Sequence, residues 1–157
     1  MSSGLPCYCV MEILEIKSDK KKYMDLLLLA DEQEDMIDRY LDRGTMYILD
    51  DDGVKAECVV TEEADGILEI KNIATDPKYQ RNGYGKKLID FIIEKYSGRY
   101  AVLQVGTGDS PLTIPFYEKC GFRRSHIVKN FFPDHYDHPI YEDGVQLVDM
   151  VYLQREL

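Results

Sequence analysis

The sequence predicts one α/β domain, and three observations lead to this prediction. The chain has 157 residues, which is enough for a single domain with its own hydrophobic core. Several short segments alternate apolar and polar residues and are joined by Asp-Gly pairs, which is typical of antiparallel strands with tight turns. Residues 67–96 add a strand pattern, a glycine-containing loop and an amphipathic helix, in that order.

The start of the chain predicts one strand and two helices. Residues 10–16 alternate and form the first strand, and residues 1–9 before it are expected to be a loose leader. Residues 21–30 and 34–43 carry apolar side chains at helical spacing, and Gly44 closes the second helix. The acidic residues between and within these helices are expected to form a solvated face.

The next segments predict three antiparallel strands. They cover residues 45–49, 54–61 and 67–74. Gly53 and Gly66 each follow an aspartate, and such Asp-Gly pairs supply the positive φ angles of a hairpin turn. Pro77 ends the third strand, because proline cannot donate a hydrogen bond to a neighbouring strand.

The second half of the chain predicts two more helices and three more strands. The first helix follows the glycines and runs to about Tyr96. The second is expected to begin near Pro111, with Asp109 or Ser110 as its cap. The strands are expected at residues 100–105, 122–129 and 145–153, with the last two paired. Residues 130–144 between them are aromatic and proline-rich and are expected to form a loop.

The charge balance argues against nucleic acid as a partner. Acidic residues number 29 against 19 basic ones, for a net charge of −10. Binding to phosphates needs a basic surface, which this composition does not supply. The negative charge is compatible with a cationic amine substrate, and it is equally the usual charge of a cytoplasmic protein.

The sequence predicts a cytoplasmic protein with no membrane partner. No apolar run reaches the ~20 residues that cross a bilayer, and the first residues lack the basic and apolar regions of a signal peptide. The four cysteines lack the paired spacing of a zinc site. We therefore expect free thiols, with Cys58 and Cys120 acting as small apolar residues.

Histidine and aspartate side chains gather at residues 134–138, in the order Asp-His-Tyr-Asp-His. A metal cluster is one interpretation of this segment. The interpretation we favour is a loop that shapes a substrate pocket or a subunit contact, so no metal is expected. The sequence leaves a homodimer open.

The loop Gln80-Arg81-Asn82-Gly83-Tyr84-Gly85, here called the glycine loop, opens a helix. A helix that begins on glycines presents unpaired N–H groups and the positive end of its dipole. Such a site suits an anion, and a pyrophosphate fits it. The basic side chains around the loop favour phosphate binding, and the alternative is a purely structural tight turn.

Two motifs resemble the GNAT superfamily of N-acetyltransferases. The glycine loop matches the Gln/Arg-x-x-Gly-x-Gly/Ala acetyl-CoA loop of that family. Residues 116–122, Phe-Tyr-Glu-Lys-Cys-Gly-Phe, are similar to its tyrosine-bearing helix, which ends in Gly-Phe. The resemblance covers nearly the whole chain, most firmly residues 67–122. It implies a central mixed, mostly antiparallel sheet of about six to seven strands flanked by about four helices.

The resemblance also implies how acetyl-CoA binds as acyl-donor cosubstrate. Backbone groups of Ile73 and Thr75 would pair with the pantetheine arm, in a splay between the strands that begin near residues 67 and 100. Ser110 stands where the family often has an asparagine that contacts the cofactor. The full set of expected cofactor-binding residues is Ile73, Ala74, Thr75, Gln80, Arg81, Asn82, Gly83, Tyr84, Gly85, Lys86 and Ser110.

Acetyl transfer needs a group that removes a proton from the amine and one that protonates the departing thiolate. The resemblance implies that Tyr117 is the acid. Glu69 matches the glutamate that histone-type members carry on the central strand, and alternation predicts that Glu69, Lys71 and Ile73 share one face. A water chain is the alternative base. Members that acetylate peptide N-termini carry a glutamate where this chain has Gln104.

These features together predict an enzyme. It would transfer the acetyl group of acetyl-CoA to a primary amine of a small molecule, by direct attack in a ternary complex. Cys120 lies at a helix end with no histidine partner in the sequence, so it is not expected to carry the acyl group. The alternatives are acetylation of a protein or peptide amine, and a non-catalytic module that senses CoA.

Overall fold

The computed structural model describes residues 10–157, so the expected leader at residues 1–9 lies outside the described residues. The strands are β1 (Glu12–Ile16), β2 (Thr45–Asp50), β3 (Val54–Ala64), β4 (Ile67–Thr75), β5 (Val102–Gly108), β6 (Arg123–Val128), β7 (Tyr141–Glu142), β8 (Val145–Gln146) and β9 (Met150–Glu156). The α-helices are α1 (Met24–Ala30), α2 (Glu34–Asp38), α3 (Tyr84–Tyr96), α4 (Ile114–Lys119) and α5 (Phe131–His135), and short 3-10 helices cover Lys20–Tyr23 and Pro77–Tyr79.

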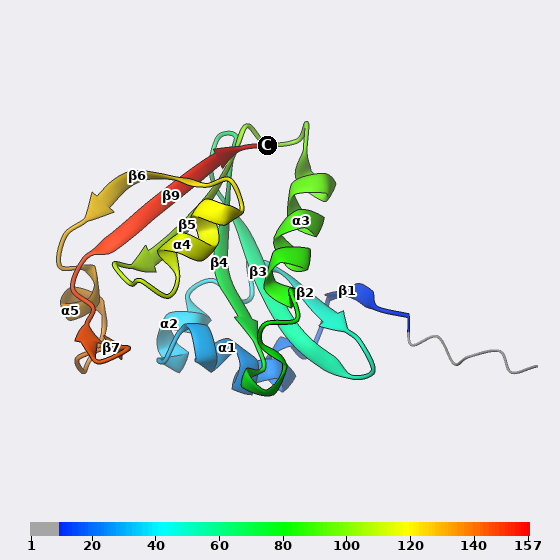
Figure 1. Cartoon of the computed structure of the whole chain (residues 1–157), viewed down its shortest axis with the longest axis horizontal. Helices are drawn as coiled ribbons and strands as arrows, with labels where there is room; N and C mark the ends of the chain where they lie inside the picture. Colours follow the sequence, from blue (N-terminus) through cyan, green and yellow to red (C-terminus); the bar gives the residue numbers. More distant parts are fainter. Residues whose placement is uncertain (1–9) are drawn as a thin grey trace, which may run out of the picture.

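Seven strands form one sheet in the order β1-β2-β3-β4-β5-β9-β6 (Figure 1). Neighbouring strands are antiparallel except β4 and β5, which run parallel. The predicted mixed, mostly antiparallel sheet is thus confirmed. The predicted pairing of the last two long strands is also present, as β6 with β9, and β9 lies between β6 and β5.

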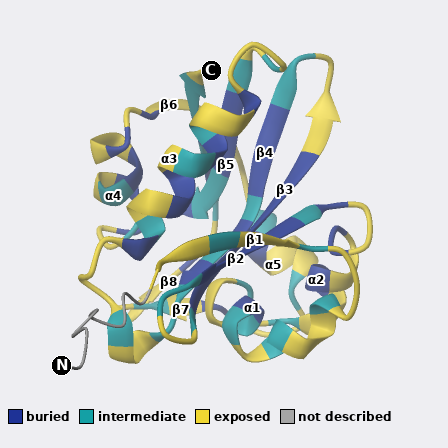
Figure 2. Cartoon of the chain, turned by 90° about the vertical axis from the view of Figure 1, so that its right-hand side faces the viewer, coloured by how far each residue is buried: buried dark blue, intermediate teal, exposed yellow. Residues whose placement is uncertain are grey.

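Helices cover both faces of this sheet (Figure 2). On one face α3 packs over the main core, where its buried residues Leu88, Ile89 and Ile92 meet apolar side chains of the central strands. On the other face α1 and α2 pack through Leu27 and Ile37. The core therefore has two layers, separated by the sheet, as the amphipathic pattern of each helix requires.

The parallel strands β4 and β5 pair only along part of their length. Their register runs from Ile67 opposite Val102 to Ile70 opposite Val105. Beyond that point β5 continues in pairing with β9, while β4 continues to Thr75 in pairing with β3. The splay expected from the family resemblance is therefore present, and it leaves one edge of β4 without a β5 partner.

A β-bulge lies where the splay begins. Ile70 is opposite Val60 and Asn72 is opposite Val59, so Lys71 is an extra residue on β4. The extra residue interrupts the alternation of the strand. Ile73 consequently packs on the α3 face, and the prediction that it shares a face with Glu69 is wrong.

Several element boundaries differ from the predictions. The second helix ends at Asp38 and continues only as turns. The helix expected from Pro111 begins at Ile114, because the Ser110 hydroxyl closes a local turn by accepting the Leu112 N–H at 3.1 Å. The strand expected over residues 145–153 is broken into β8 and β9.

Residues 130–144 are not a plain loop, because they contain α5 and β7. Strands β7 and β8 form a hairpin whose turn residues Asp143 and Gly144 have φ angles of 52° and 75°. A small buried cluster supports this hairpin, and its members are Phe132, Ile140 and Leu147. The hairpin and α5 lie beside each other at one end of β9 (Figure 1).

Candidate active site

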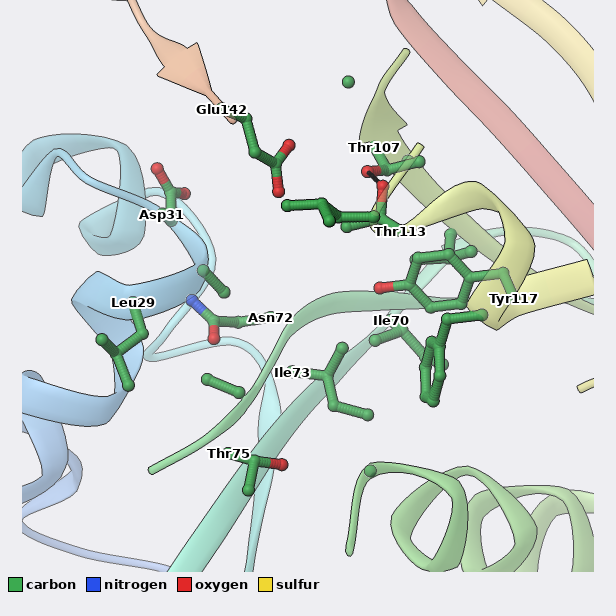
Figure 3. Close-up of a pocket in the computed structure, with 18 of the residues that line it drawn as sticks. Leu29, Asp31, Ile70, Asn72, Ile73, Thr75, Thr107, Thr113, Tyr117 and Glu142 are labelled. Atoms are coloured by element: carbon green, nitrogen blue, oxygen red, sulfur yellow. Dashed lines mark hydrogen bonds between the residues drawn. The ribbon is translucent and has the colours of Figure 1, made fainter. Parts of the chain in front are cut away.

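A cavity of about 710 Å³ opens at the splay between β4 and β5. Its wall is built from the end of α1, the second half of β4, the glycine loop, the end of β5, α4 and the β7–β8 hairpin. Figure 3 shows side chains from these elements converging on one space. Segments far apart in the sequence therefore meet here because the sheet splits at this point.

The glycine loop forms one end of the cavity. Gly83 has a φ of 79° and is the N-cap of α3, and Arg81 has a φ of 71°. Gln80, Arg81, Gly83, Tyr84, Gly85 and Lys86 line the cavity. Arg81 and Lys86 are exposed, although Lys86 also forms an ion pair with Asp90 at 2.8 Å. The start of a 13-residue helix and two cations thus face the same space.

Three residues expected at the cofactor use their side chains elsewhere. The Asn82 amide donates to the Tyr79 carbonyl at 2.8 Å. The Tyr84 hydroxyl donates to Asp51 at 2.6 Å. Ser110 is buried, and neither it nor Asn82 lines the cavity. These side chains shape the loops around the cavity.

Two threonines that the sequence did not single out line the cavity near Ser110. Their hydroxyl oxygens, Oγ1 of Thr107 and Oγ1 of Thr113, are 2.7 Å apart. The predicted strand ended at residue 105, so Thr107 was not expected in it. Thr107 and its neighbours Gly106 and Gly108 instead belong to β5, where a Cβ on either glycine would clash with neighbouring side chains.

The three expected residues of β4 all line the cavity, namely Ile73, Ala74 and Thr75. They lie beyond the last pairing with β5. Gly85 stands across from Thr75, and a Cβ on Gly85 would lie 3.2 Å from the ring of Phe116. The space between β4, α3 and α4 is therefore narrow at this point.

Tyr117 projects from α4 with its hydroxyl pointing into the cavity (Figure 3). The residue is only 7% exposed and packs edge-on against Phe116 and Phe122. Burial raises the pKa of the Tyr117 phenol, and the charges of nearby groups raise it further. The hydroxyl therefore keeps its proton across the physiological pH range.

Glu69 does not line the cavity. Its carboxylate accepts a hydrogen bond from the Gln104 amide at 2.6 Å and pairs with Lys71 at 2.7 Å. Gln104 in turn accepts from the Gln154 amide at 2.6 Å. Glu69 is thus buried at the centre of a row of polar side chains that crosses β4, β5 and β9. Its ion-pair partner Lys71 lines the cavity.

Three acidic residues line the cavity, namely Asp31, Glu32 and Glu142. Figure 3 shows Asp31 and Glu142 at the end away from Thr75, which lies beside Gly85 of the glycine loop. Asp31 accepts hydrogen bonds from the hydroxyls of Tyr136 at 2.7 Å and Tyr40 at 3.1 Å. Burial raises the pKa of the Asp31 carboxyl, and these two hydrogen bonds offset part of that effect. The cavity thus has a cationic end and an anionic end.

The segment after α5 is fastened over the loop between α1 and α2. Besides the bond from Tyr136 to Asp31, the backbone N–H of Asp137 donates to the Gln33 side chain at 3.1 Å. We call this segment, residues 136–138, the strap.

Within residues 10–157 no group of three or more His, Cys, Asp or Glu side chains is placed to hold a metal ion, and no described helix is long and apolar enough to span a membrane.

Known proteins share this architecture. A family model described as the acetyltransferase (GNAT) domain matches residues 42–124. The N-acetyltransferase YvbK of Bacillus subtilis (strain 168) is 40% identical over 136 residues, which cover 85% of this chain and 88% of the relative. A GNAT family acetyltransferase from Elizabethkingia anophelis, solved with acetyl-CoA bound, is 37% identical with a TM-score of 0.88, over 94% of this chain and 98% of that chain.

A more distant relative acts on a protein. The ribosomal protein bS18-alanine N-acetyltransferase of Escherichia coli (strain K12) is 30% identical over 99 residues, which cover 61% of this chain and 64% of the relative. The solved acetyltransferase from Elizabethkingia anophelis has this fold over nearly the whole chain, and it was solved with acetyl-CoA bound. The matches extend over nearly the whole chain, and it belongs to the GNAT family of acetyltransferases. The protein is thus an acetyl-CoA-dependent N-acetyltransferase, as the two sequence motifs predicted.

Proposed function

We propose that this enzyme acetylates the primary amine of a small molecule, by direct attack of the amine on acetyl-CoA in a ternary complex. The observation that carries the proposal is the single cavity that joins the glycine loop to the Tyr117 hydroxyl through the gap between β4 and β5. Donor and acceptor meet there without a covalent enzyme intermediate. Cys120 does not line the cavity, and burial raises the pKa of its thiol, which supports direct attack.

In this proposal the cationic end of the cavity holds the donor. Backbone N–H groups of the glycine loop bind the pyrophosphate at the start of α3, and Arg81 and Lys86 add positive charge. The unpaired edge of β4 binds the pantetheine arm through backbone groups of Ile73 and Thr75, as an added strand would. The Ile73 N–H then faces the thioester oxygen and stabilises the charge that develops on it.

Tyr117 acts as the general acid. Its phenol donates a proton to the thiolate sulfur of CoA as the carbon–sulfur bond breaks. Burial of Tyr117 supports this role, because a high pKa keeps the phenol protonated until the thiolate forms. Glu69 is less suited to direct base catalysis, since its carboxylate is already bound by Gln104 and Lys71. We propose that Glu69 instead holds the Lys71 side chain in place.

Two features favour a small acceptor over a protein. The strap covers the acceptor end of the cavity through the bonds to Asp31 and Gln33. Gln104, at the place of the glutamate in peptide N-terminal acetyltransferases, has its amide occupied by Glu69 and Gln154. Similarity to the bS18-alanine enzyme keeps a peptide amine as the alternative. A non-catalytic CoA-sensing module has less support, since the tyrosine of the catalytic helix is retained.

The proposal is tested by calorimetric binding of acetyl-CoA, followed by free-thiol release with polyamines, aminoglycosides and short peptides. Tyr117→Phe is expected to lower turnover by about 10²- to 10⁴-fold and to leave acetyl-CoA affinity unchanged. Tyr100→Phe is the matched control, because its hydroxyl binds Glu62 outside the cavity.

Each result has a distinct meaning. Unchanged turnover of the Tyr117 variant would remove that residue from the mechanism. Absence of acetyl-CoA binding would contradict the donor assignment. Thiol release with peptides alone would make the acceptor a peptide or protein amine.

A further inference from the structure

One of the three acidic side chains in the cavity is free to bind a substrate. Asp31 is held by two tyrosine hydroxyls. Glu32 lies 3.7 Å from the His138 ring, and its side chain is half exposed. Glu142 lines the cavity and makes no side-chain hydrogen bond or ion pair with any of residues 10–157. Its carboxylate is thus the available anionic group.

The backbone of Glu142 is held firmly in place. It is the last residue of β7 and pairs with Val145 across the turn. The turn residues Asp143 and Gly144 both have positive φ, which is the geometry of a tight two-residue hairpin. The Leu147 N–H donates to the Ile140 carbonyl at 2.8 Å, and both side chains are buried. The hairpin therefore fixes the point at which the Glu142 side chain enters the cavity.

Glu142 and Tyr117 enter the cavity from different elements and point into the same space. Figure 3 shows the carboxylate descending from the hairpin and the phenol extending from α4. Burial is the main cause that raises the pKa of Tyr117, and the negative charge of Glu142 adds to it. A proton acceptor and a proton donor therefore flank the region where donor and acceptor substrates would meet.

We propose that Glu142 binds the ammonium group of the acceptor and removes its proton as the nitrogen attacks the thioester. This inference rests on the proposed function and adds to it the missing base. It also specifies the acceptor class as an alkyl primary amine, which carries a positive charge near neutral pH. The anionic end of the cavity attracts that charge, while the glycine loop attracts the phosphates of the donor.

The proton balance of the reaction is complete with these two residues. One proton passes from the ammonium nitrogen to the Glu142 carboxylate, and the freed lone pair forms the carbon–nitrogen bond. The carbon–sulfur bond breaks, and the sulfur takes the phenolic proton of Tyr117. The nitrogen cation then gives one of its two protons to the Tyr117 phenolate and keeps the other as the amide N–H, and Glu142 releases its proton to solvent. The first step replaces two charges by a neutral amine and a neutral acid, and partial burial of the groups favours the neutral pair.

The test compares Glu142→Gln, Glu142→Asp and Asp143→Asn with the unmodified enzyme. Asp143→Asn removes the same charge from the same hairpin, on an exposed side chain that does not line the cavity, and asparagine suits the turn. Thiol release is measured with spermidine and phenethylamine, which are charged near neutral pH, and with hydroxylamine, which is largely neutral there. Calorimetry with acetyl-CoA verifies that each variant retains the donor site.

Glu142→Gln is expected to lower kcat/KM for the charged amines by about 10²- to 10⁴-fold, with hydroxylamine turnover and acetyl-CoA affinity kept. Glu142→Asp should recover part of the loss, and Asp143→Asn should match the unmodified enzyme. Unchanged turnover of Glu142→Gln with the charged amines would overturn the inference and leave the proposed function standing. Equal losses with charged amines and hydroxylamine would also overturn it, because the ammonium proton would then be irrelevant. An unmodified enzyme that acetylates none of the amines would overturn both proposals.

Discussion

Leu147 fills the space that a side chain at position 108 would need. A Cβ built on Gly108 would lie 2.6 Å from the Cδ1 atom of Leu147, well inside van der Waals contact. Gly108 is the last residue of β5, and Leu147 belongs to the small cluster that supports the β7–β8 hairpin. Because Gly108 has no side chain, the hairpin can approach the sheet this closely. This approach in turn sets the position of Glu142.

We predict that Gly108→Ala forces Leu147 to shift and displaces the hairpin. The expected loss of unfolding free energy is about 1–3 kcal/mol, as for other overpacked sites. Amine turnover should fall as well, since the hairpin carries Glu142. Adding Leu147→Ala makes room for the new methyl group, so the double variant should lose less stability than the sum of the single variants. Urea unfolding of all the variants measures this coupling.

Gly106→Ala is the control for this experiment. The three atoms nearest to a Cβ there belong to Met150, at 2.9 Å, and to the ring of Tyr152, and none belongs to Leu147. Its cost should therefore add to that of Leu147→Ala without relief. Strict additivity of the Gly108 and Leu147 substitutions would mean that the hairpin accommodates the methyl group without moving.

The two ends of α3 offer a matched pair of glycines. Gly83 at its start and Gly98 after its end have φ angles of 79° and 80°, and a Cβ at either position would meet no atom within 4 Å. Replacing either one by valine strains the backbone by about 1–2 kcal/mol. Only Gly83 lines the cavity. We predict that Gly83→Val weakens acetyl-CoA binding by about tenfold or more, while Gly98→Val leaves it unchanged.

Gly83→Asn refines this prediction. Asparagine tolerates the left-handed conformation, so this variant should keep most of the affinity if backbone geometry is what matters. Calorimetry on the three variants separates backbone strain from loss of the binding loop. Normal acetyl-CoA affinity of Gly83→Val would contradict the assignment of the glycine loop to the pyrophosphate.

The parts of the fold that the sequence predicted are those encoded by local patterns. The hairpin turns at Gly53 and Gly66 follow from the φ angles that glycine permits, and both have positive φ. The helix over Tyr84–Tyr96 ends where the apolar periodicity predicted. Two short motifs, the glycine loop and the tyrosine helix, were enough to identify the family.

The features of the fold that the sequence did not predict depend on pairing between strands that are distant in the sequence. The bulge at Lys71 arises from the register between β3 and β4, and alternation along β4 alone could not reveal it. Strict alternation therefore predicted Glu69 on the same face as Ile73, which is nearer to the cleft than its position in the structure. The placement of β9 between β5 and β6 likewise depends on contacts between distant segments. Four expectations stay predictions, namely the leader, the number of domains, the cytoplasmic location and a homodimer.

Glu142 was missed although a relevant pattern was present. Asp143-Gly144 is the same dipeptide that predicted the other two hairpins. Strands β7 and β8 have only two residues each, which is too short for alternation to be recognised. The turn dipeptide alone could have predicted this hairpin, while its approach to Gly108 required the structure.

Glu63 gives the fold a pH dependence that can be measured. Burial raises the pKa of the Glu63 carboxyl, but bonds from Arg43 and Thr61 together with the charge of Lys71 outweigh burial and bring it from 4.5 to about 2. The folded state therefore binds fewer protons than the unfolded state between these values. The stabilisation is fully present above pH 4.5 and is lost as the pH falls towards 2. We predict that Glu63→Gln lowers the unfolding free energy at neutral pH by about 1–2 kcal/mol, allowing for solvent screening.

The difference between Glu63→Gln and the unmodified protein should shrink on acidification, because the carboxylate becomes protonated and resembles the amide. Urea unfolding monitored by circular dichroism at several pH values between neutral and acidic measures this convergence. Glu94→Gln is the control, since Glu94 is exposed on α3 and pairs with no described residue, and it should follow the unmodified protein throughout. A constant difference at every pH would mean that Glu63 stabilises the fold through packing and that its ion pairs with Arg43 and Lys71 contribute nothing measurable.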